Sequence, residues 1–374
     1  MPNTHDIPFY DLSRVPDNVQ DEWLEAIELV IKSGRYVNGP TVTSFESYWS
    51  NIVGCEYAIG VGNGLDGLSI ALEAIGVGKG DHVVLPAHTF IASWIAIDRV
   101  GAIPVGIDVN EKGLMDIRNL SNLEVLPKAI MPVHMHGTVC DMPEIMKWAN
   151  TNSVRVIEDA SQSHFAKTTG ISGGAFGDAG VFSLYPTKNL GALGDAGVVV
   201  TNNLEIAESV REKANYGSTK TNKYLHSSLG SNSRLDSIQA AVLNINLKYS
   251  NTWNAKRCEI AAYYEGECQK MNIKVLQKSD GNNVFHHFVI QSNTRDECRA
   301  FLSNMGIQSE IHYPRNAALE YCEIKGLKYP GYPIAEGISA TSISLPLSPW
   351  MTSEEAESVI SGLVEAKKAN LVNY

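Results

Sequence analysis

Cysteine is scarce in this sequence, and its six cysteines are scattered along the chain. No two of them form a CxxC motif. This spacing does not suit a zinc site or a disulfide framework, and it is typical of free thiols in a reducing compartment. We therefore expect a cytoplasmic protein that has no metal site.

Long uncharged hydrophobic runs are also missing. A membrane-spanning helix needs about 18 or more apolar residues in succession. The best candidate, residues 90–107, is interrupted by Asp98 and Arg99. The first residues, MPNTHDIPFYDL, contain no basic stretch followed by an apolar one. We expect neither a secretory signal nor an association with membranes.

Positive charge is the third shortage. The 374 residues include 30 Lys and Arg against 41 Asp and Glu, giving a formal net charge of −11, and they contain no run of basic residues. This balance argues against nucleic acid and anionic membranes as partners. A phosphate-bearing small molecule is still compatible with it, because backbone amides and one or two local cations can hold a phosphate.

The sequence is rich in apolar strand patterns that alternate with helical ones. Between about residues 55 and 202, segments such as VRVIED and AGVFSL are separated by amphipathic helices. Continuous apolar strands alternating with helices predict an α/β domain whose mostly parallel sheet is buried on both faces.

After about residue 245 the pattern is typical of a smaller α+β unit, with strands expected at NVFHHFVIQS and SEIHYP. We predict a large domain over residues 1–248 and a small domain over residues 249–374. The first helix is expected to begin near Pro16 and to end at Gly34, which is a typical C-cap residue. We expect this helix to pack on the small domain.

Polar side chains gather where the expected parallel strands end, and ligands of such sheets bind beyond the carboxyl ends of the strands. VRVIED ends in Asp159 and is followed by Gln162, while AGVFSL contains Ser183 and leads to Lys188. A glycine-rich turn at residues 60–64 precedes a helix, and it would present free backbone amides to an anion.

Lys188 lies in the stretch FSLYPTKNLGALGDAG, and no acidic residue stands within six positions of it. A reactive amine, a carboxylate such as Asp159, an aromatic side chain such as Phe90 and a phosphate cradle are what pyridoxal phosphate (PLP) requires together. The amine forms a Schiff base with the aldehyde, the carboxylate pairs with the ring nitrogen, and the aromatic side chain stacks on the ring. The hypothesis depends on their joint occurrence.

Over nearly its whole length the chain resembles the DegT/DnrJ/EryC1/StrS family of PLP-dependent nucleotide-sugar aminotransferases. The matching stretches are SGRYVNGPTVTSFE, YAIGVGNGLDGLSIALEAIGVGKGDHVVLPAHTFIAS, GAIPVGIDV, MPVHMHGTVCDM, VIEDASQSH, FGDAGVFSLYPTKNLGALGDAG and GSNSRLDSIQAAVL. The resemblance implies fold type I of the PLP enzymes, with a mostly parallel seven-stranded sheet in the large domain and a small C-terminal α+β domain. It also implies a homodimer with shared active sites.

The resemblance further implies roles for individual residues. Lys188 matches the Schiff-base lysine, Asp159 the partner of the ring nitrogen, and Gln162 the contact of the ring hydroxyl. The remaining cofactor residues implied in this way are Phe90, which would stack on the ring, Gly64, Leu65 and Ser183, which would bind the phosphate, and Asn232, which would reach the phosphate from the other subunit.

Members of the family transfer an amino group, usually from L-glutamate, to a keto group of a nucleoside-diphosphate sugar. GNGLDGL and TFIASWIAI are more similar to members acting on dTDP-linked 3-keto-6-deoxyhexoses than to the 4-keto group, where NGT and TFVAT are usual. The resemblance thus favours a 3-amino-3,6-dideoxyhexose product, used for a surface polysaccharide such as lipopolysaccharide O-antigen or for another glycoconjugate. The residues expected to contact the substrate are Tyr224, His226, Arg234 and Tyr313.

Several departures and alternatives bear on this interpretation. The chain has VHMHG, with His136 where the family usually has tyrosine, EDASQSHFA for EDAAQAHGA, and RNAALEYC after HYP. These departures affect the sugar assignment, so a 4-keto-sugar or an aminocyclitol (keto-inositol) aminotransferase remains open.

Three other classes fit the residues less well. Sugar dehydratases of the family have histidine in place of Lys188, and a non-catalytic regulatory member would be expected to lose Lys188 or Asp159. A dinucleotide-binding oxidoreductase is suggested by Gly60, Gly62 and Gly64. Their spacing is not GxGxxG, and such an enzyme would leave Lys188 unexplained.

Overall fold

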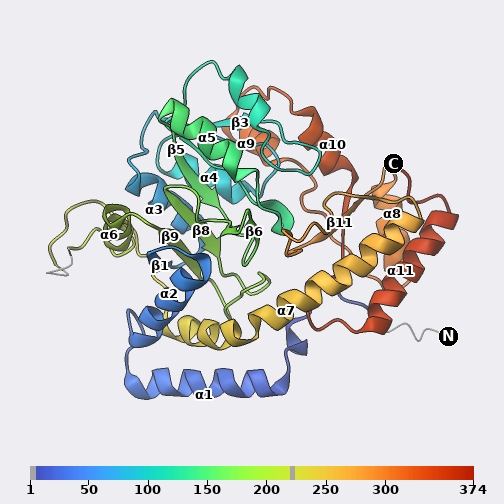
Figure 1. Ribbon diagram of the computed structural model, residues 1–374, viewed down its shortest axis with the longest axis horizontal. Helices are drawn as coiled ribbons and strands as arrows, with labels where there is room; N and C mark the ends of the chain where they lie inside the picture. The colour runs from blue at the N-terminus through green and yellow to red at the C-terminus, as the bar shows by residue number, and fades with distance from the viewer. Residues whose placement is uncertain (1–5, 220–223) are drawn as a thin grey trace.

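A seven-stranded sheet forms the centre of the computed structural model, which describes residues 6–219 and 224–374 (Figure 1). Its strand order is β1-β9-β8-β5-β4-β2-β3. The strands are β1 (Tyr57–Val61), β2 (His82–Pro86), β3 (Ile103–Ile107), β4 (Ala129–Ile130), β5 (Arg155–Asp159), β8 (Ala179–Ser183) and β9 (Gly197–Thr201). Only β9 is antiparallel to its neighbours in this sheet. The predicted mostly parallel sheet is confirmed.

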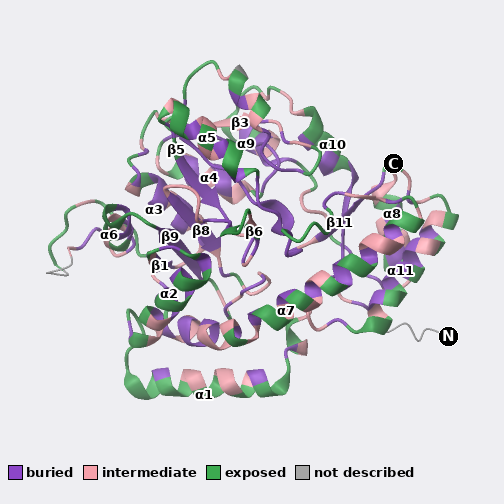
Figure 2. Cartoon of the chain, viewed as in Figure 1, coloured by how far each residue is buried: buried purple, intermediate pink, exposed green. Residues whose placement is uncertain are grey.

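Helices cover both faces of this sheet, because the apolar side chains of the strands alternate between two cores. Val199 of β9 belongs to a core with α3 (Gly64–Ala74), α4 (Ile91–Arg99) and α6 (Leu204–Lys213). Val198 and Val200 face the opposite core, which includes α2 (Pro40–Val53) and the first part of α7 (Ser237–Lys270). α5 (Met142–Asn152) packs over the other end of the sheet. Figure 2 shows the central strands β8 and β9 as mostly buried, whereas the edge strand β3 is mostly of intermediate exposure.

Beyond α7, a second sheet has the order β10-β11-β12 and is antiparallel. Its elements are β10 (Lys274–Val275), β11 (Phe288–Gln291) and β12 (Ser342–Leu345), with α8 (Arg295–Asn304) and α11 (Ser353–Lys368) packed in the same core. The strand expected at SEIHYP is wrong, because there only Glu310 pairs, through an isolated bridge to Ser344. The remaining elements are α9 (Ala317–Lys325), α10 (Pro333–Thr341), the hairpin of β6 (Lys167–Thr168) and β7 (Ile171–Ser172), and three short 3-10 helices, Leu12–Arg14, Ile117–Asn122 and Met135–Gly137.

The long helix α7 links the two units, and the predicted domain boundary after residue 248 falls inside it. α1 (Asp17–Ser33) ends where expected, since Gly34 adopts φ 65°. This helix lies along α7 (Figure 1), and the indole of Trp23 donates to Asn246 at 2.8 Å. The segment before α1 reaches the C-terminal unit, where Ile7 pairs with Ile307. Among the described residues, none of the helices combines the length and apolar character needed to cross a bilayer.

Candidate active site

A cavity of about 460 Å³ opens at the carboxyl ends of β2, β5 and β8. Because β5 and β8 are parallel neighbours, with Asp159 opposite Val181, the residues that end these strands emerge side by side. The sequence-predicted residues that line this cavity are Gly64, Leu65, Phe90, Asp159, Gln162, Ser183, Lys188 and Tyr313. The fold therefore brings together segments that are far apart in the sequence.

Lys188 lies in the loop between β8 and β9, and its amide donates to the carbonyl of Tyr185 at 2.9 Å. The loop is tight at Gly191, where a Cβ atom would lie 2.4 Å from the carbonyl oxygen of Pro186. Burial lowers the pKa of the Lys188 amine to about 8, and the Asp159 carboxylate partly opposes this change. The amine is thus much closer to its neutral, nucleophilic form at physiological pH than an exposed lysine is.

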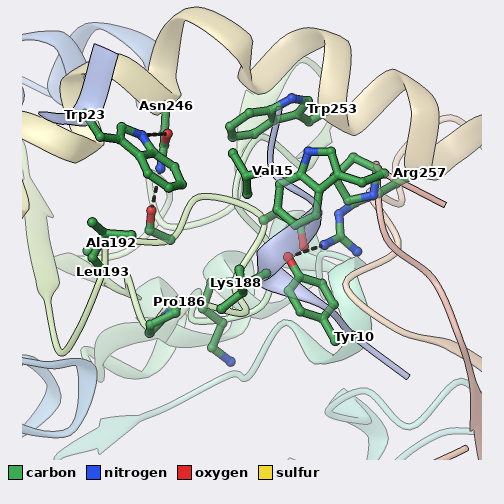
Figure 3. A pocket seen from close by; sticks show the side chains of 15 residues that line it. Tyr10, Val15, Trp23, Pro186, Lys188, Ala192, Leu193, Asn246, Trp253 and Arg257 are labelled. Atoms are coloured by element: carbon green, nitrogen blue, oxygen red, sulfur yellow. Dashed lines mark hydrogen bonds between the residues drawn. The ribbon is translucent and has the colours of Figure 1, made fainter. Parts of the chain in front are cut away.

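The other side of this loop rests on an aromatic layer beneath α7, shown in Figure 3. The stem of Lys188 there lines a small cavity of about 30 Å³ together with Tyr10, Trp253 and Arg257. Its terminal nitrogen points away from these side chains (Figure 3). The guanidinium of Arg257 is buried and donates to the carbonyl of Leu347 and to the hydroxyl of Tyr10, both at 3.1 Å. This packing fixes the direction in which the lysine leaves the loop.

Asp159 is a buried carboxylate whose two oxygens both accept hydrogen bonds. The amide of Ser161 donates to Oδ1 at 3.1 Å, and the hydroxyl of Ser93 donates to Oδ2 at 2.8 Å. The backbone of Asp159 is also fixed, since its amide donates to the carbonyl of Pro132 and its carbonyl accepts from the amide of His134. A carboxylate held in this way can pair with a cationic N–H group in the cavity.

The glycine-rich turn lines the cavity at the start of α3. The side chain of Asn63 caps the helix by accepting from the amide of Asp66 at 2.8 Å. The amides of Gly64 and Leu65 belong to the first turn, where backbone N–H groups have no partner within the helix. A Cβ atom on Gly64 would lie 2.9 Å from the Cβ of Ser183, so only glycine allows the helix to approach the strand end this closely. An anion fits here.

An aromatic pair lies at the mouth of the cavity. The ring of Phe90, which is 52% exposed, lies 5.4 Å from the ring of Tyr313. The Tyr313 hydroxyl accepts from the side-chain amide of Gln162 at 3.1 Å, and the Gln162 carbonyl accepts from the amide of His136 at 2.7 Å. Gln162 is thereby held at the cavity wall.

A group of histidines that sequence reasoning did not assign to the site also lines the cavity. His287 and His312 stack with their ring centroids 3.9 Å apart. Behind them, Nδ1 of His136 lies 3.2 Å from Nδ1 of His287. Burial lowers the pKa of His312 to about 4, with a smaller contribution from Lys188, and it lowers the pKa of His136 and His287 well below the usual range. The sequence signals for this neutral imidazole wall were the histidines of FHH before β11, of VHMHG and of IHYP.

The other predicted residues do not line this cavity. Arg234 donates to the side-chain oxygens of Asn215 and Asn232, and it lies over the ring of Tyr216. His226 contacts the carbonyl of Tyr216 at 3.0 Å. Tyr224 is exposed, at 76%. The roles of Asn232, Arg234, Tyr224 and His226 therefore remain predictions that require a second subunit.

The residues of the cavity fit PLP on three observations. The open helix start at Gly64 suits the phosphate, the buried Asp159 suits the ring nitrogen, and Lys188 provides an amine whose pKa is lowered. In the part of the chain that the structure describes, no three His, Cys, Asp or Glu side chains are grouped as metal ligands.

Comparison with known proteins identifies the family. The model of the DegT/DnrJ/EryC1/StrS aminotransferase family matches residues 17–364. The chain belongs to this family. It is similar to dTDP-3-amino-3,6-dideoxy-alpha-D-galactopyranose transaminase of Aneurinibacillus thermoaerophilus, with 40% identity covering 96% of this chain and 98% of the relative. It is also similar to dTDP-3-amino-3,4,6-trideoxy-alpha-D-glucose transaminase of Streptomyces venezuelae, with 37% identity covering 96% of each chain.

Solved structures agree with this assignment. S. venezuelae DesV in complex with a ketimine intermediate is 36% identical, with a TM-score of 0.93 covering 97% of this chain and 99% of that one. NtdA from Bacillus subtilis with bound cofactor PMP is 28% identical, with a TM-score of 0.91 covering 98% and 86%. This member of the family is therefore a PLP-dependent aminotransferase with the fold type I architecture predicted from the sequence.

Proposed function

We propose that this aminotransferase moves an amino group from L-glutamate to the 3-keto group of a dTDP-linked 3-keto-6-deoxyhexose, giving a 3-amino-3,6-dideoxyhexose. The observation that carries the proposal is the joint lining of one cavity by Lys188, Asp159 and the recess at Gly64. The names of the relatives support position 3, because they include dTDP-3-amino-sugar transaminases, two UDP-sugar enzymes acting at the same position, and a 3-oxo-glucose-6-phosphate:glutamate aminotransferase.

In the proposed reaction, most of the cavity residues bind the cofactor, and Lys188 transfers the proton. PLP, when bound, supplies an electron sink that stabilises negative charge on the carbon carrying the amino group. Asp159 would hold the ring nitrogen, the amides at Gly64 and Leu65 would bind the phosphate, and Phe90 would stack on the ring. The Lys188 amine, whose pKa is lowered to about 8, would serve as the general base and acid that takes up and returns the proton at the substrate carbon.

The neutral imidazole wall suits the hydroxyl groups of a sugar. Imidazoles that are uncharged each offer one donor and one acceptor, which matches the hydroxyl groups of a hexose. His287, His312 and Tyr313 line the cavity beside Lys188. The keto group would face the amine while the ring hydroxyls contact this wall.

We further propose a homodimer in which Tyr224, His226, Asn232 and Arg234 complete the active site of the partner. Asn232 and Arg234 are linked to each other and to Asn215, yet neither side chain lines the cavity of its own chain. Asn232 would then bind the cofactor phosphate across the interface, and Tyr224, His226 and Arg234 would bind the nucleotide sugar.

A 4-keto sugar, a UDP-linked sugar and a keto-inositol are the competing substrates. Two relatives are named as a sensory transduction protein and a pleiotropic regulatory protein. A purely regulatory role is disfavoured for this chain, because both Lys188 and Asp159 line the same cavity.

The test is a side-by-side assay with L-glutamate as donor and four acceptors: dTDP-linked 3-keto and 4-keto 6-deoxyhexoses, a UDP-linked 3-keto sugar and a keto-inositol. We expect turnover to be fastest with the dTDP-linked 3-keto sugar and to disappear in Lys188→Ala. Faster turnover of another acceptor would replace the proposed substrate by that one. A wild-type protein that develops no absorption near ~410–430 nm with PLP, the usual range for the bound cofactor, would refute the proposed chemistry.

A further inference from the structure

Two buried hydroxyl groups, those of Ser93 and Thr89, extend from Asp159 in one hydrogen-bonded chain, and Thr89 also lines the cavity. The hydroxyl of Ser93, on the first turn of α4, contacts Oδ2 of Asp159 at 2.8 Å. The hydroxyl of Thr89 contacts that of Ser93 at 3.0 Å. The exposed fraction is 0% for Ser93 and 2% for Thr89, so water does not replace either contact. Neither residue was assigned a role in binding the cofactor.

The chemistry of these groups fixes the direction of both hydrogen bonds. An ionised carboxylate only accepts, so the single hydroxyl hydrogen of Ser93 points at Asp159. Ser93 then has no hydrogen left for Thr89, and Thr89 must donate to Ser93. The three residues form a one-way chain from Thr89 through Ser93 to Asp159, in which each bond polarises the next.

The position of Ser93 also couples two parts of the cofactor site. Phe90 is the N-cap of α4, and Ser93 follows three residues later, about one helical turn away. The first turn of α4 thus fixes the positions of both Phe90, at the mouth of the cavity, and Ser93, which contacts Asp159. A shift of this turn would move both groups together.

We infer that Ser93 is a positioning residue for the cofactor: it holds Oδ2 of Asp159 while the Ser161 amide holds Oδ1, so that the carboxylate plane is fixed and its free lone pairs face the ring nitrogen. This inference rests on the proposed pairing of Asp159 with that nitrogen. Loss of the Ser93 hydroxyl leaves Oδ2 buried without its donor, and the carboxylate is then free to rotate. This rotation weakens the hold of Asp159 on a protonated ring nitrogen.

The variants Ser93→Ala and Thr89→Val test the inference, with Ser250→Ala as the control. Ser250 is a buried serine whose hydroxyl donates to Leu247 within α7, outside the residues that line the cavity. Apoenzyme would be titrated with PLP, and the bound cofactor, labelled with ¹⁵N in its ring, would be examined by NMR. The nitrogen chemical shift reports directly whether the ring nitrogen is protonated.

Ser93→Ala is expected to bind PLP about ten- to hundredfold more weakly, the range expected for removing a hydrogen bond to a charged group. Its ring nitrogen signal should move toward the unprotonated value. Thr89→Val should bind PLP about threefold to tenfold more weakly than the wild type. This variant tests the inference if Ser93→Ala does not fold. Ser250→Ala should match the wild type in both measurements.

Wild-type affinity together with an unchanged nitrogen shift in both variants would overturn the role of Ser93. This outcome differs from failure of the proposed function, in which the wild-type apoenzyme itself would not bind PLP. A loss of affinity with an unmoved nitrogen shift would also overturn the inference, because it would indicate a packing defect rather than a lost carboxylate geometry.

Discussion

Replacing Lys188 by methionine is expected to stabilise the apoenzyme, although it removes the reactive amine. Burial lowers the pKa of this amine from 10.5 to about 8. Each pKa unit corresponds to about 1.36 kcal/mol, so the protonated amine costs the folded state about 3.4 kcal/mol at neutral pH. Water reaches the cavity beside the amine, which reduces this cost, and we expect a gain of about 2 kcal/mol for Lys188→Met at pH 7.

The dependence on pH follows from proton binding in the two states. Below about pH 8 the amine is protonated in both the folded and the unfolded chain, and the full cost is present. Between about pH 8 and 10.5 only the unfolded chain keeps the proton, so the wild type gains stability with rising pH. The advantage of the methionine variant should therefore be constant below pH 8 and shrink above it.

Urea unfolding of cofactor-free protein at several pH values measures this difference. Lys147→Met is the control, because the Lys147 side chain is 75% exposed and its removal should change stability little at any pH. A Lys188→Met variant that is no more stable than the wild type at pH 7 would contradict the buried character of the amine. An advantage that persists unchanged at pH 10 would contradict its titration.

Three further outcomes are expected. Gly64→Ala should weaken PLP binding at least tenfold, because the new Cβ lies 2.9 Å from the Cβ of Ser183. Gly78→Ala is the control and should bind PLP like the wild type, because the space around Gly78 is open. Equal affinities of the two variants in a PLP titration would contradict this expectation. Stopped-flow absorbance should show PLP capture by the apoenzyme accelerating with pH up to about 8, and a flat profile would exclude the lowered pKa of Lys188. Glu158→Gln should lower the free energy of unfolding by about 2–4 kcal/mol. The reason is that the Glu158 carboxylate accepts from three backbone amides and faces His134. A loss below about 1 kcal/mol in thermal or urea unfolding would refute this.

The parts of the site that could be predicted are those that follow regular strands. Asp159 and Ser183 end two continuous apolar segments, and such segments become parallel neighbours whose ends meet at one edge. Lys188 was recognisable because it lies in a glycine-rich loop after one of these strands and no acidic residue stands within six positions of it. Periodicity alone located these residues near one another, and the family motifs assigned their roles.

Other parts depend on contacts that periodicity does not encode. Ser93 meets Asp159 across 66 positions of the sequence, and a serine within an apolar helix is indistinguishable from a packing residue. The stacking of His287 on His312 joins two irregular segments. A strand was expected at SEIHYP, and none was expected at the short SISL segment. In the structure, SISL forms β12 and pairs with β11 along its length.

The length of α7 gives the two walls of the cavity a mechanical connection. Its 34 residues span roughly 50 Å at 1.5 Å per residue. The first half packs against the sheet that holds the cofactor residues, and the second half packs against the unit from which His287 projects. A tilt of about 5° over an arm of roughly 25 Å, half of the helix at this rise, moves the far end by about 2 Å. A small rotation at the middle of this helix would therefore change the width of the space into which the sugar must fit.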